Sequence, residues 1–314
     1  MITMSLQEEI SLLLFGLLLL AVYGAESILL LSYAYLRIRR GFWKGIRLAR
    51  FDIGLHILAA IGIICLLYGY FIEPYWVDVT EMTIHTAKLK NTSFRIVQIS
   101  DLHCDNVPRN EERAVRIIQR LKPDIIVATG DFLNRASALP RLQATLRRLD
   151  APLGKLAVKG NFEIGCWPHL DLFKDTGFHV LDRDTVVVTK QGDAIAISGL
   201  SFGLADAYRD VLQEPVDGRF HIFLFHAPDL IEDIRGLGVD LYLCGHTHGG
   251  QVALPLYGAL ITFSKFGKRY EAGRYELDGT TLYVNRGLGL EPRPAPQVRF
   301  LARPEIAVFD IVPE

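Results

Sequence analysis

The chain has 314 residues, of which 50% are hydrophobic and 22% charged, so its composition excludes an intrinsically disordered protein. Its formal net charge of −1 provides no basic field for DNA or RNA, and we expect no nucleic-acid partner. The four cysteines form no C-x-x-C pair, which argues against a disulfide scaffold and against a structural zinc ribbon. The mean hydropathy of +0.23 indicates that apolar residues are concentrated in one part of the chain.

That part is the N-terminal region. Segments 10–36 and 53–72 each supply the roughly 20 apolar residues that a bilayer core requires. Glu26 is the one charge in the first, and the second has no acidic or basic residue except His56. A buried hairpin of a soluble protein is the alternative, but core helices seldom run so long without a polar face. A cleaved signal peptide is disfavoured, because acids rather than bases precede the first segment. We therefore expect a two-helix transmembrane hairpin in residues 1–72.

The loop between these two segments is strongly basic. Residues 37–50 carry six Lys or Arg side chains and no acid, and the positive-inside rule places such a loop in the cytoplasm. Both termini would then lie on the outer, non-cytoplasmic face. We expect a multi-pass protein of the cell membrane with the lipid bilayer as a partner, a tether with a first strand at 73–92, and a large domain at 93–314 on the outer face.

The downstream sequence has the pattern of an α/β domain. Five short apolar runs rich in β-forming residues lie at 94–100, 124–130, 155–160, 221–226 and 241–246. Helical patterns between the first three runs, at 110–121 and 141–149, indicate a sheet built from β-α-β units. Further strands, expected as antiparallel additions, lie at 179–190, 193–200, 281–285 and 305–312. This amount of strand predicts two packed sheets.

A metal-capable side chain follows each of the five runs. These residues are Asp101 and His103, Asp131, Asn161, His226, and His246 with His248. One Asp after a strand is usually a turn or capping residue, but seven such residues at five consecutive strand ends are hard to explain in that way. Because sites in α/β sheets form beyond the carboxyl ends of strands, we expect all seven to converge.

Two carboxylates, four imidazoles and one amide exceed what a single ion needs. They suit two divalent ions that share a carboxylate, as in hydrolytic dinuclear sites. Mixed nitrogen and oxygen ligands favour manganese, with iron or zinc as alternatives. Cys104 and Cys244 lie next to these residues, and we expect them to be packing residues, with thiolate ligation as the minor alternative.

The motifs Asp101-x-His103, Gly130-Asp131, Gly160-Asn161, His226 and Gly245-His246-Thr247-His248 resemble the five motifs of the calcineurin-like metallophosphoesterases. The resemblance covers about residues 77–314. RIVQISDLH, GHTHGGQ, LYVNRGLGL and VRFLARPEI are similar to the membrane-associated bacterial branch of that family. The resemblance implies an α/β fold, a four-layer αββα sandwich, preceded here by the transmembrane hairpin.

The resemblance also implies a role for each ligand. Asp101, His103 and His248 would hold a first metal, and Asn161, His226 and His246 a second, with Asp131 bridging the two. A metal-bound hydroxide would then attack phosphorus in line, and no side-chain nucleophile would be needed. The catalytic candidates within this set are Asp131, Asn161 and His248.

One position departs from the family pattern. The usual Gly-Asn-His-Asp/Glu is replaced by Gly-Asn-Phe162-Glu163, and Phe cannot donate a proton. Loss of general acid assistance, typically worth 10²–10⁴-fold, matters least for a good leaving group such as a phosphate. His169 and Arg135 are possible substitutes. Arg109 and Arg135 could bind phosphate oxygens, and a solvated loop position is an equal alternative for both.

The sequence therefore predicts a membrane-anchored dinuclear phosphoesterase. It would hydrolyse a phosphodiester or pyrophosphate bond of a lipid-linked or membrane-surface substrate. A lipid A precursor pyrophosphatase fits this description, but its nucleotide-linked substrate is cytosolic, which conflicts with the predicted orientation. The alternative is a metal-binding receptor or scaffold with a degenerate site, signalled by Phe162. A transporter subunit is weaker, because two helices offer little material for a pathway.

Overall fold

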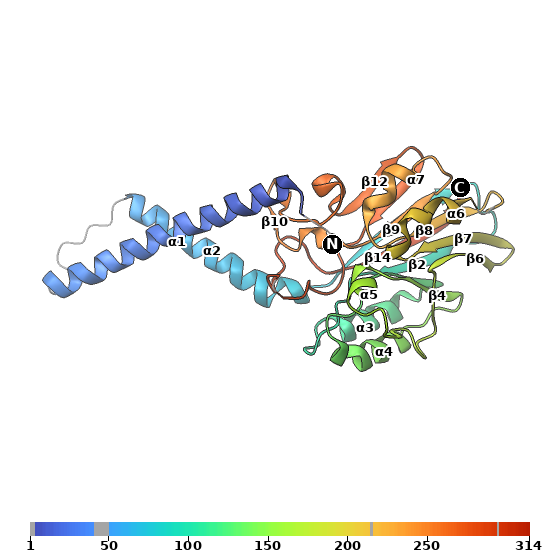
Figure 1. The fold of residues 1–314 in the computed structure, drawn as a ribbon, viewed down its shortest axis with the longest axis horizontal. Helices are drawn as coiled ribbons and strands as arrows, with labels where there is room; N and C mark the ends of the chain where they lie inside the picture. The colour runs from blue at the N-terminus through green and yellow to red at the C-terminus, as the bar shows by residue number, and fades with distance from the viewer. Residues whose placement is uncertain (1–3, 41–49, 214–215, 294) are drawn as a thin grey trace.

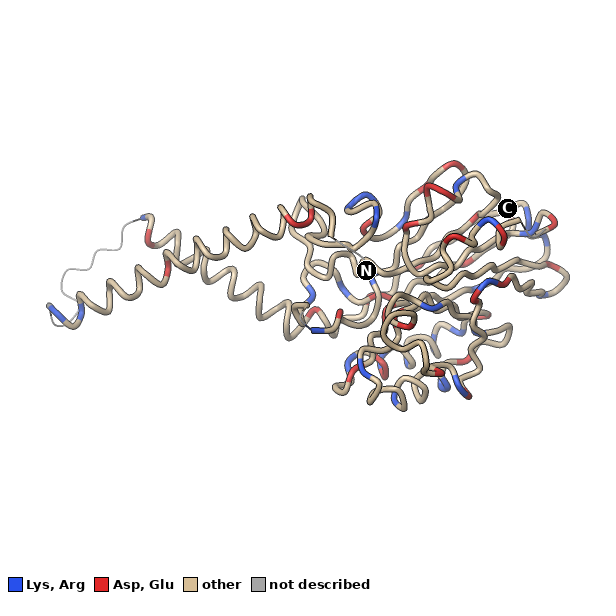
Figure 2. Tube along the Cα trace, in the orientation of Figure 1, with Lys and Arg blue, Asp and Glu red and all other residues tan. Residues whose placement is uncertain are grey.

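The computed structural model describes residues 4–40, 50–213, 216–293 and 295–314, so Lys44 and Arg47 of the basic loop lie outside the described residues. Figure 1 shows a pair of long helices that projects from one end of an α/β domain. The charged residues are concentrated in the domain and are few along the helix pair (Figure 2).

The two long helices cover almost all of the predicted apolar segments. Helix α1 spans Leu6–Arg40 and α2 spans Arg50–Phe71, and both are long and apolar enough to cross a membrane by length and composition. The one acid in the predicted first segment faces the histidine of the second, with Glu26 Oε1 at 2.7 Å from His56 Nδ1. Polar groups within such helices are commonly satisfied by one another in this way.

The domain contains two six-stranded sheets. The first has the order β1-β14-β2-β3-β4-β5, with bounds Asp78–Thr86, Glu305–Pro313, Phe94–Ile99, Ile125–Thr129, Gly154–Val158 and Phe178–Val180. The second has the order β12-β13-β9-β8-β7-β6, with bounds Gly273–Leu277, Thr280–Val284, Leu241–Cys244, Phe220–Leu224, Asp193–Leu200 and Arg183–Lys190. A two-stranded ribbon consists of β10 and β11, with bounds Ala253–Leu254 and Gly258–Ala259.

Hydrophobic packing arranges these elements in four layers. The inner faces of the two sheets share one core, to which Ile96 and Val127 contribute from the first sheet and Ile197 and Ile222 from the second. A second core lies under α3 and α4, with bounds Glu111–Leu121 and Leu139–Arg147, and a third under α6 and α7, with bounds Tyr208–Leu212 and Ile231–Ile234. These helix pairs lie on opposite sides of the sheets (Figure 1), which is the expected αββα sandwich.

The strand directions correct one expectation. Strand β7 is parallel to β8 and β13 is parallel to β9, whereas both were expected as antiparallel additions. The chain passes from β7 through α6 to β8, and a crossover of this kind returns it in the same direction. On their other edges β7 pairs antiparallel with β6, and β13 pairs antiparallel with β12, a strand that was not predicted. Strand β14 pairs antiparallel with β2, as expected. Strand β1 pairs along its length with β14, so segment 73–92 contributes directly to the first sheet.

Candidate metal centre

The seven predicted ligand residues lie beyond the carboxyl ends of five strands that belong to both sheets. Asp101 and His103 follow β2, Asp131 follows β3, Asn161 begins the short helix α5 (Asn161–Gly165) after β4, His226 follows β8, and His246 and His248 follow β9. Six of them are at least 97% buried, and Asn161 is half-buried. The packing of one sheet on the other therefore brings motifs that are far apart in sequence to one place.

Six of the seven form two compact groups. The ligand atoms of Asp101, His103 and His248 all lie within 4.8 Å of one another, and so do those of Asp131, His226 and His246. In the first group His103 Nε2 is 3.1 Å from His248 Nε2, and in the second His226 Nε2 is 3.1 Å from His246 Nδ1. Asn161 joins the second group, with its Oδ1 at 3.0 Å from His226 Nε2.

Asp131 lies between the two groups. Its Oδ2 is 3.3 Å from His226 Nε2 and 3.9 Å from His103 Nε2, and this buried oxygen has no hydrogen-bond partner among the described residues. An unpartnered buried carboxylate oxygen is costly unless a cation binds it. The carboxylate, imidazole and amide donors around it match the ligands that manganese, iron and zinc accept, so these residues fit a dinuclear centre.

The second ring nitrogen of three of the histidines is held by a fixed oxygen. His103 Nδ1 lies 2.6 Å from Asn134 Oδ1, His226 Nδ1 lies 2.7 Å from the Thr129 carbonyl, and His246 Nε2 lies 3.1 Å from the Phe263 carbonyl. Such contacts orient a ligating imidazole and point its free nitrogen at the metal.

Five of the seven residues have a left-handed backbone, which is unfavourable for residues with a side chain. Their φ angles are 48° at Asp101, 42° at His103, 53° at Asp131, 74° at His246 and 53° at His248. Strain of this kind persists only where the surrounding structure imposes it, and it clusters at functional sites. The backbone thus supports the interpretation of these strand ends as a binding site.

Burial of several acids makes the centre strongly receptive to cations. Burial raises the pKa of Asp101 to about 7. Burial and the nearby charge of Asp131 also raise the pKa of Glu163 to about 7. Burial also opposes ionisation of Asp131, but the positive charge on His226 outweighs it and lowers the pKa to about 2. Burial lowers the pKa of His226, but the negative charge of Asp131 outweighs this effect and raises the pKa to about 10. A divalent ion bound here must displace that proton, so its affinity rises with pH.

Glu163 holds the backbone under Asp131. Its carboxylate accepts hydrogen bonds from the N–H groups of Asp131, Phe132 and Gly160, each at 2.8 Å. It thereby connects the loops that follow β3 and β4.

Two residues of the site were missed by the sequence analysis. Glu291 Oε1 lies 3.5 Å from His248 Nε2 and 3.9 Å from His103 Nε2, and burial raises the pKa of Glu291 to about 8. Arg299 is fully buried, donates to the Gly289 carbonyl and lies 3.2 Å from His248 Nδ1. Both come from the irregular segment between β13 and β14, which has no strand end or periodicity to reveal them.

The structure separates the remaining candidates. Phe162 packs edge-on against His103, with ring centroids 5.0 Å apart, so its ring lies beside the proposed metal ligands. Arg109 and Arg135 line a different cavity, of about 360 Å³, together with Arg293.

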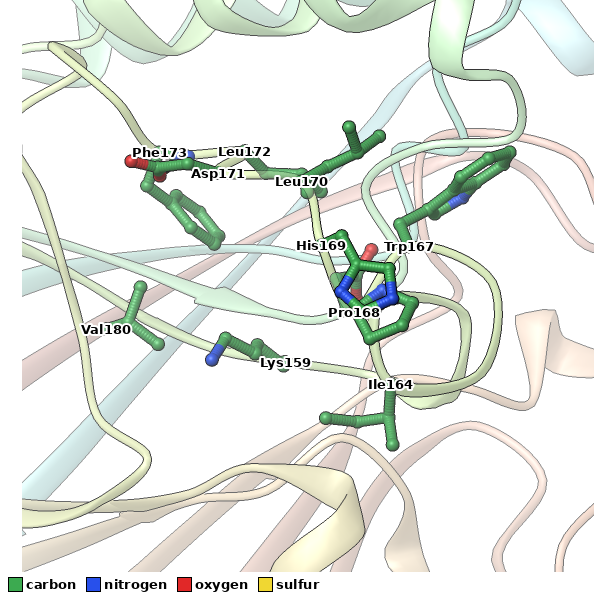
Figure 3. A pocket seen from close by; sticks show the side chains of 11 residues that line it. Lys159, Ile164, Trp167, Pro168, His169, Leu170, Asp171, Leu172, Phe173 and Val180 are labelled. Atoms are coloured by element: carbon green, nitrogen blue, oxygen red, sulfur yellow. Dashed lines mark hydrogen bonds between the residues drawn. The ribbon is translucent and has the colours of Figure 1, made fainter.

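His169 is exposed and lines a cavity of about 460 Å³ whose lining includes none of the seven ligand residues (Figure 3). It lies beside Pro168 and Ile164 there, on the loop that follows α5. The exposure of His169 and its place in this separate cavity favour an ordinary surface residue over a substitute for the missing histidine.

Comparisons with known proteins agree with this geometry. The family model of the calcineurin-like phosphoesterases matches residues 94–250. The metallophosphoesterase YkuE of Bacillus subtilis (strain 168) is 37% identical, over 78% of this chain and 89% of its own length. The UDP-2,3-diacylglucosamine pyrophosphatase LpxG of Chlamydia trachomatis is 27% identical, over 81% of this chain and 95% of its own length. The phosphodiesterase YaeI of Escherichia coli (strain K12) is also 27% identical, over 78% and 92%.

The family match begins at the strand before Asp101 and ends just after His248, so it includes all seven ligand residues. The geometry and the matches together show that the chain belongs to the calcineurin-like phosphoesterase family of metal-dependent phosphoester hydrolases, which use a dinuclear divalent metal centre.

Proposed function

We propose that this protein is a membrane-anchored phosphoesterase that hydrolyses a phosphodiester or pyrophosphate bond in a lipid-linked substrate. The observation that carries the proposal is the arrangement of ligand groups around the partnerless oxygen of Asp131, beside two apolar helices that dock on the same domain. LpxG is named as a pyrophosphatase and YaeI as a phosphodiesterase, so each of the two bond types has a named relative.

Both helices are fixed to loops close to the metal centre. Glu8, at the start of α1, is 1% exposed and accepts hydrogen bonds from the N–H and hydroxyl of Thr262, at 2.6 and 2.8 Å. At the end of α2 the Gly69 carbonyl accepts a hydrogen bond from the N–H of Arg299 at 2.9 Å. A hairpin inserted in the bilayer would therefore hold the metal centre against the membrane surface.

The residues of the centre form two groups, each of which would hold one metal ion. Asp101, His103 and His248 would hold one ion and Asn161, His226 and His246 the other, with Asp131 between them. Two divalent ions held by these residues, for which we propose manganese, would supply activation of a water molecule and stabilisation of the charge on the phosphoryl oxygens.

Three arginine side chains in a cavity separate from the ligand residues are candidates to bind phosphate. Arg109, Arg135 and Arg293 line one cavity, and planar guanidinium groups match phosphate oxygens with paired hydrogen bonds. Because Phe162 cannot protonate a leaving group, we propose that the natural substrate has a good one, as in a pyrophosphate.

The orientation in the membrane follows from the charge of the loop at 37–50, and we propose that the domain lies on the non-cytoplasmic face. A reporter fused after Glu314 tests this. Activity of a reporter that works only outside the cytosol supports the proposal. Activity of a cytosolic reporter contradicts it and would allow a nucleotide-linked lipid as substrate.

The test of the activity is hydrolysis of bis(p-nitrophenyl) phosphate by the detergent-purified chain in Mn²⁺, compared with Asp131→Asn. We expect turnover by the wild type and a loss of at least about 10²-fold in the variant, because Asp131 contacts both groups of ligands. Loss of turnover with retained secondary structure supports the proposal. Equal turnover by the two proteins refutes the assigned centre.

A further inference from the structure

A mostly apolar groove of about 510 Å³ connects the metal centre to α1. Its floor includes His246, His248 and Glu291, and its far wall consists of Leu12 and Phe15 of α1. The volume lies within the range of about 300–1,000 Å³ that small-molecule sites occupy. The groove thus begins at residues proposed to surround the metal ions and ends on a helix that is apolar enough to cross a bilayer.

The position of the wall on α1 indicates where the groove opens. Leu12 and Phe15 are two and five residues into the apolar segment that begins at Ile10. At about 1.5 Å per residue they lie about 3 and about 8 Å from its start, within the outer edge of the hydrocarbon region when the helix is inserted. Leu13 and Leu14 are each 61% exposed, so the helix surface next to the groove would contact lipid directly.

The sides of the groove are also apolar. Val252, Leu260 and Ile261 come from the loop that holds α1 through Thr262, and Phe162 closes the end nearest to His103. Substitution of Phe for the usual histidine at position 162 therefore adds apolar surface at the point where the groove meets the metal centre.

Positively charged side chains lie in a second cavity that shares one lining residue with the groove. Arg293 lines both the groove and the cavity that contains Arg109 and Arg135, and Tyr70 and Tyr75 near the end of α2 line that second cavity. An amphiphile with one apolar chain and an anionic head group has the complementary distribution: the chain fits the groove on the α1 side and the head group fits the arginines on the α2 side.

We propose that the groove between α1 and the metal centre binds the hydrocarbon chain of a phosphorylated membrane lipid. This inference rests on the proposed function and specifies its substrate class. In the reaction, the oxygen of water forms a bond to phosphorus and the bond from phosphorus to the leaving oxygen breaks. The leaving group departs with the bonding electron pair, and water loses its proton to solvent.

Two synthetic phosphodiesters test the proposal. Hexadecyl p-nitrophenyl phosphate and ethyl p-nitrophenyl phosphate have the same reacting bond and the same leaving group, and differ only in chain length. A buried methylene contributes about fourfold in kcat/KM. We therefore expect the full chain, in Mn²⁺ and at a fixed detergent mole fraction, to prefer the hexadecyl ester by at least about tenfold.

Two neighbouring leucines provide a matched pair of variants. Leu12→Trp fills the groove, whereas Leu13→Trp places the same side chain on a neighbouring position of α1 that does not line it. We expect Leu12→Trp to lose the preference for the hexadecyl ester by at least about tenfold and to keep the wild-type kcat/KM for the ethyl ester. Leu13→Trp should retain both values.

The outcomes distinguish this inference from the proposed function. If the wild type hydrolyses neither ester, the proposed function fails. If it hydrolyses both with equal kcat/KM, the hydrolase stands and the groove proposal is overturned. Equal losses in Leu12→Trp and Leu13→Trp also overturn it, because the effect would then come from insertion of the helix.

Discussion

Replacing Gly160 by alanine tests the metal centre without removing a ligand. A Cβ atom at this position would lie 2.2 Å from Asp131 Oδ1 and 2.7 Å from the Asp131 backbone nitrogen. The φ angle of Gly160 is −90°, which alanine adopts freely, so the substitution adds a steric contact and no backbone strain. Its effect therefore reports on the space beside Asp131.

The size of the effect follows from these distances. Real Cβ contacts are almost never shorter than 3.0 Å, so the Asp131 carboxylate must move from 2.2 Å to at least that distance, by about 0.8 Å. Ligand distances at metal sites hold to within about 0.2 Å. Displacement of a supporting group typically costs 10–100-fold in metal affinity, and we expect at least that loss for Gly160→Ala.

The assay is titration of Mn²⁺ into chelator-stripped protein in detergent, with bound manganese counted after gel filtration. Gly165→Ala is the matched control, because Gly165 ends the short helix that Gly160 precedes and a Cβ there would meet no atom within 4 Å. Unchanged Mn²⁺ affinity in Gly160→Ala would show that Asp131 does not occupy the position we assign to it. An equal loss in both variants would indicate a general effect on the helix.

Two further substitutions address the leaving group and the effect of pH. Phe162→His should accelerate hydrolysis of a dialkyl phosphate by about 10²-fold or more and change p-nitrophenyl ester hydrolysis little, because only the alkoxide needs a proton. Equal acceleration of both esters would contradict this. Burial raises the pKa of Asp229, so the protein loses stability as the pH rises through the folded-state pKa and the carboxyl ionises. The Oδ1 atom of Asp229 accepts hydrogen bonds from Ser264 Oγ and from the N–H of Lys265. Asp229→Asn can keep both bonds, so its Tm should exceed that of the wild type at neutral pH, with the difference vanishing in acid; a lower Tm at every pH would refute this.

The convergence of the proposed ligand residues was predictable because the signals for it are local. Each ligand follows a short apolar run, and the end of a strand is where the chain leaves the sheet and exposes a side chain to the crevice. The motifs also resembled a known family, so the αββα layers could be predicted before the structure. The parallel direction of β7 and β13 could not, because it depends on which strands become neighbours rather than on the sequence of either strand.

Sequence patterns did not predict the contacts of Glu291, Arg299 and Glu8. The first two reach the site only because the irregular segment between β13 and β14 crosses the ends of other strands. Glu8 precedes the first apolar segment, as the sequence shows, but its burial against Thr262 was not predicted. In each case the contact joins residues far apart in sequence, and neither composition nor periodicity records such a contact.

The same contact explains how an anchor can determine specificity. Thr262 holds Glu8 of α1, and the carbonyl of the next residue, Phe263, is 3.1 Å from His246 Nε2. Helix α1 is thus connected to His246, a proposed metal ligand, through two adjacent residues, and insertion of α1 in a bilayer, as we propose, would fix the height of the centre above the membrane. Phe162 removes the group that would assist a poor leaving group and adds apolar surface beside His103. Under the proposed function, a site with a fixed height, an apolar entrance and no proton donor at position 162 would select substrates that lie in the membrane and that carry a good leaving group.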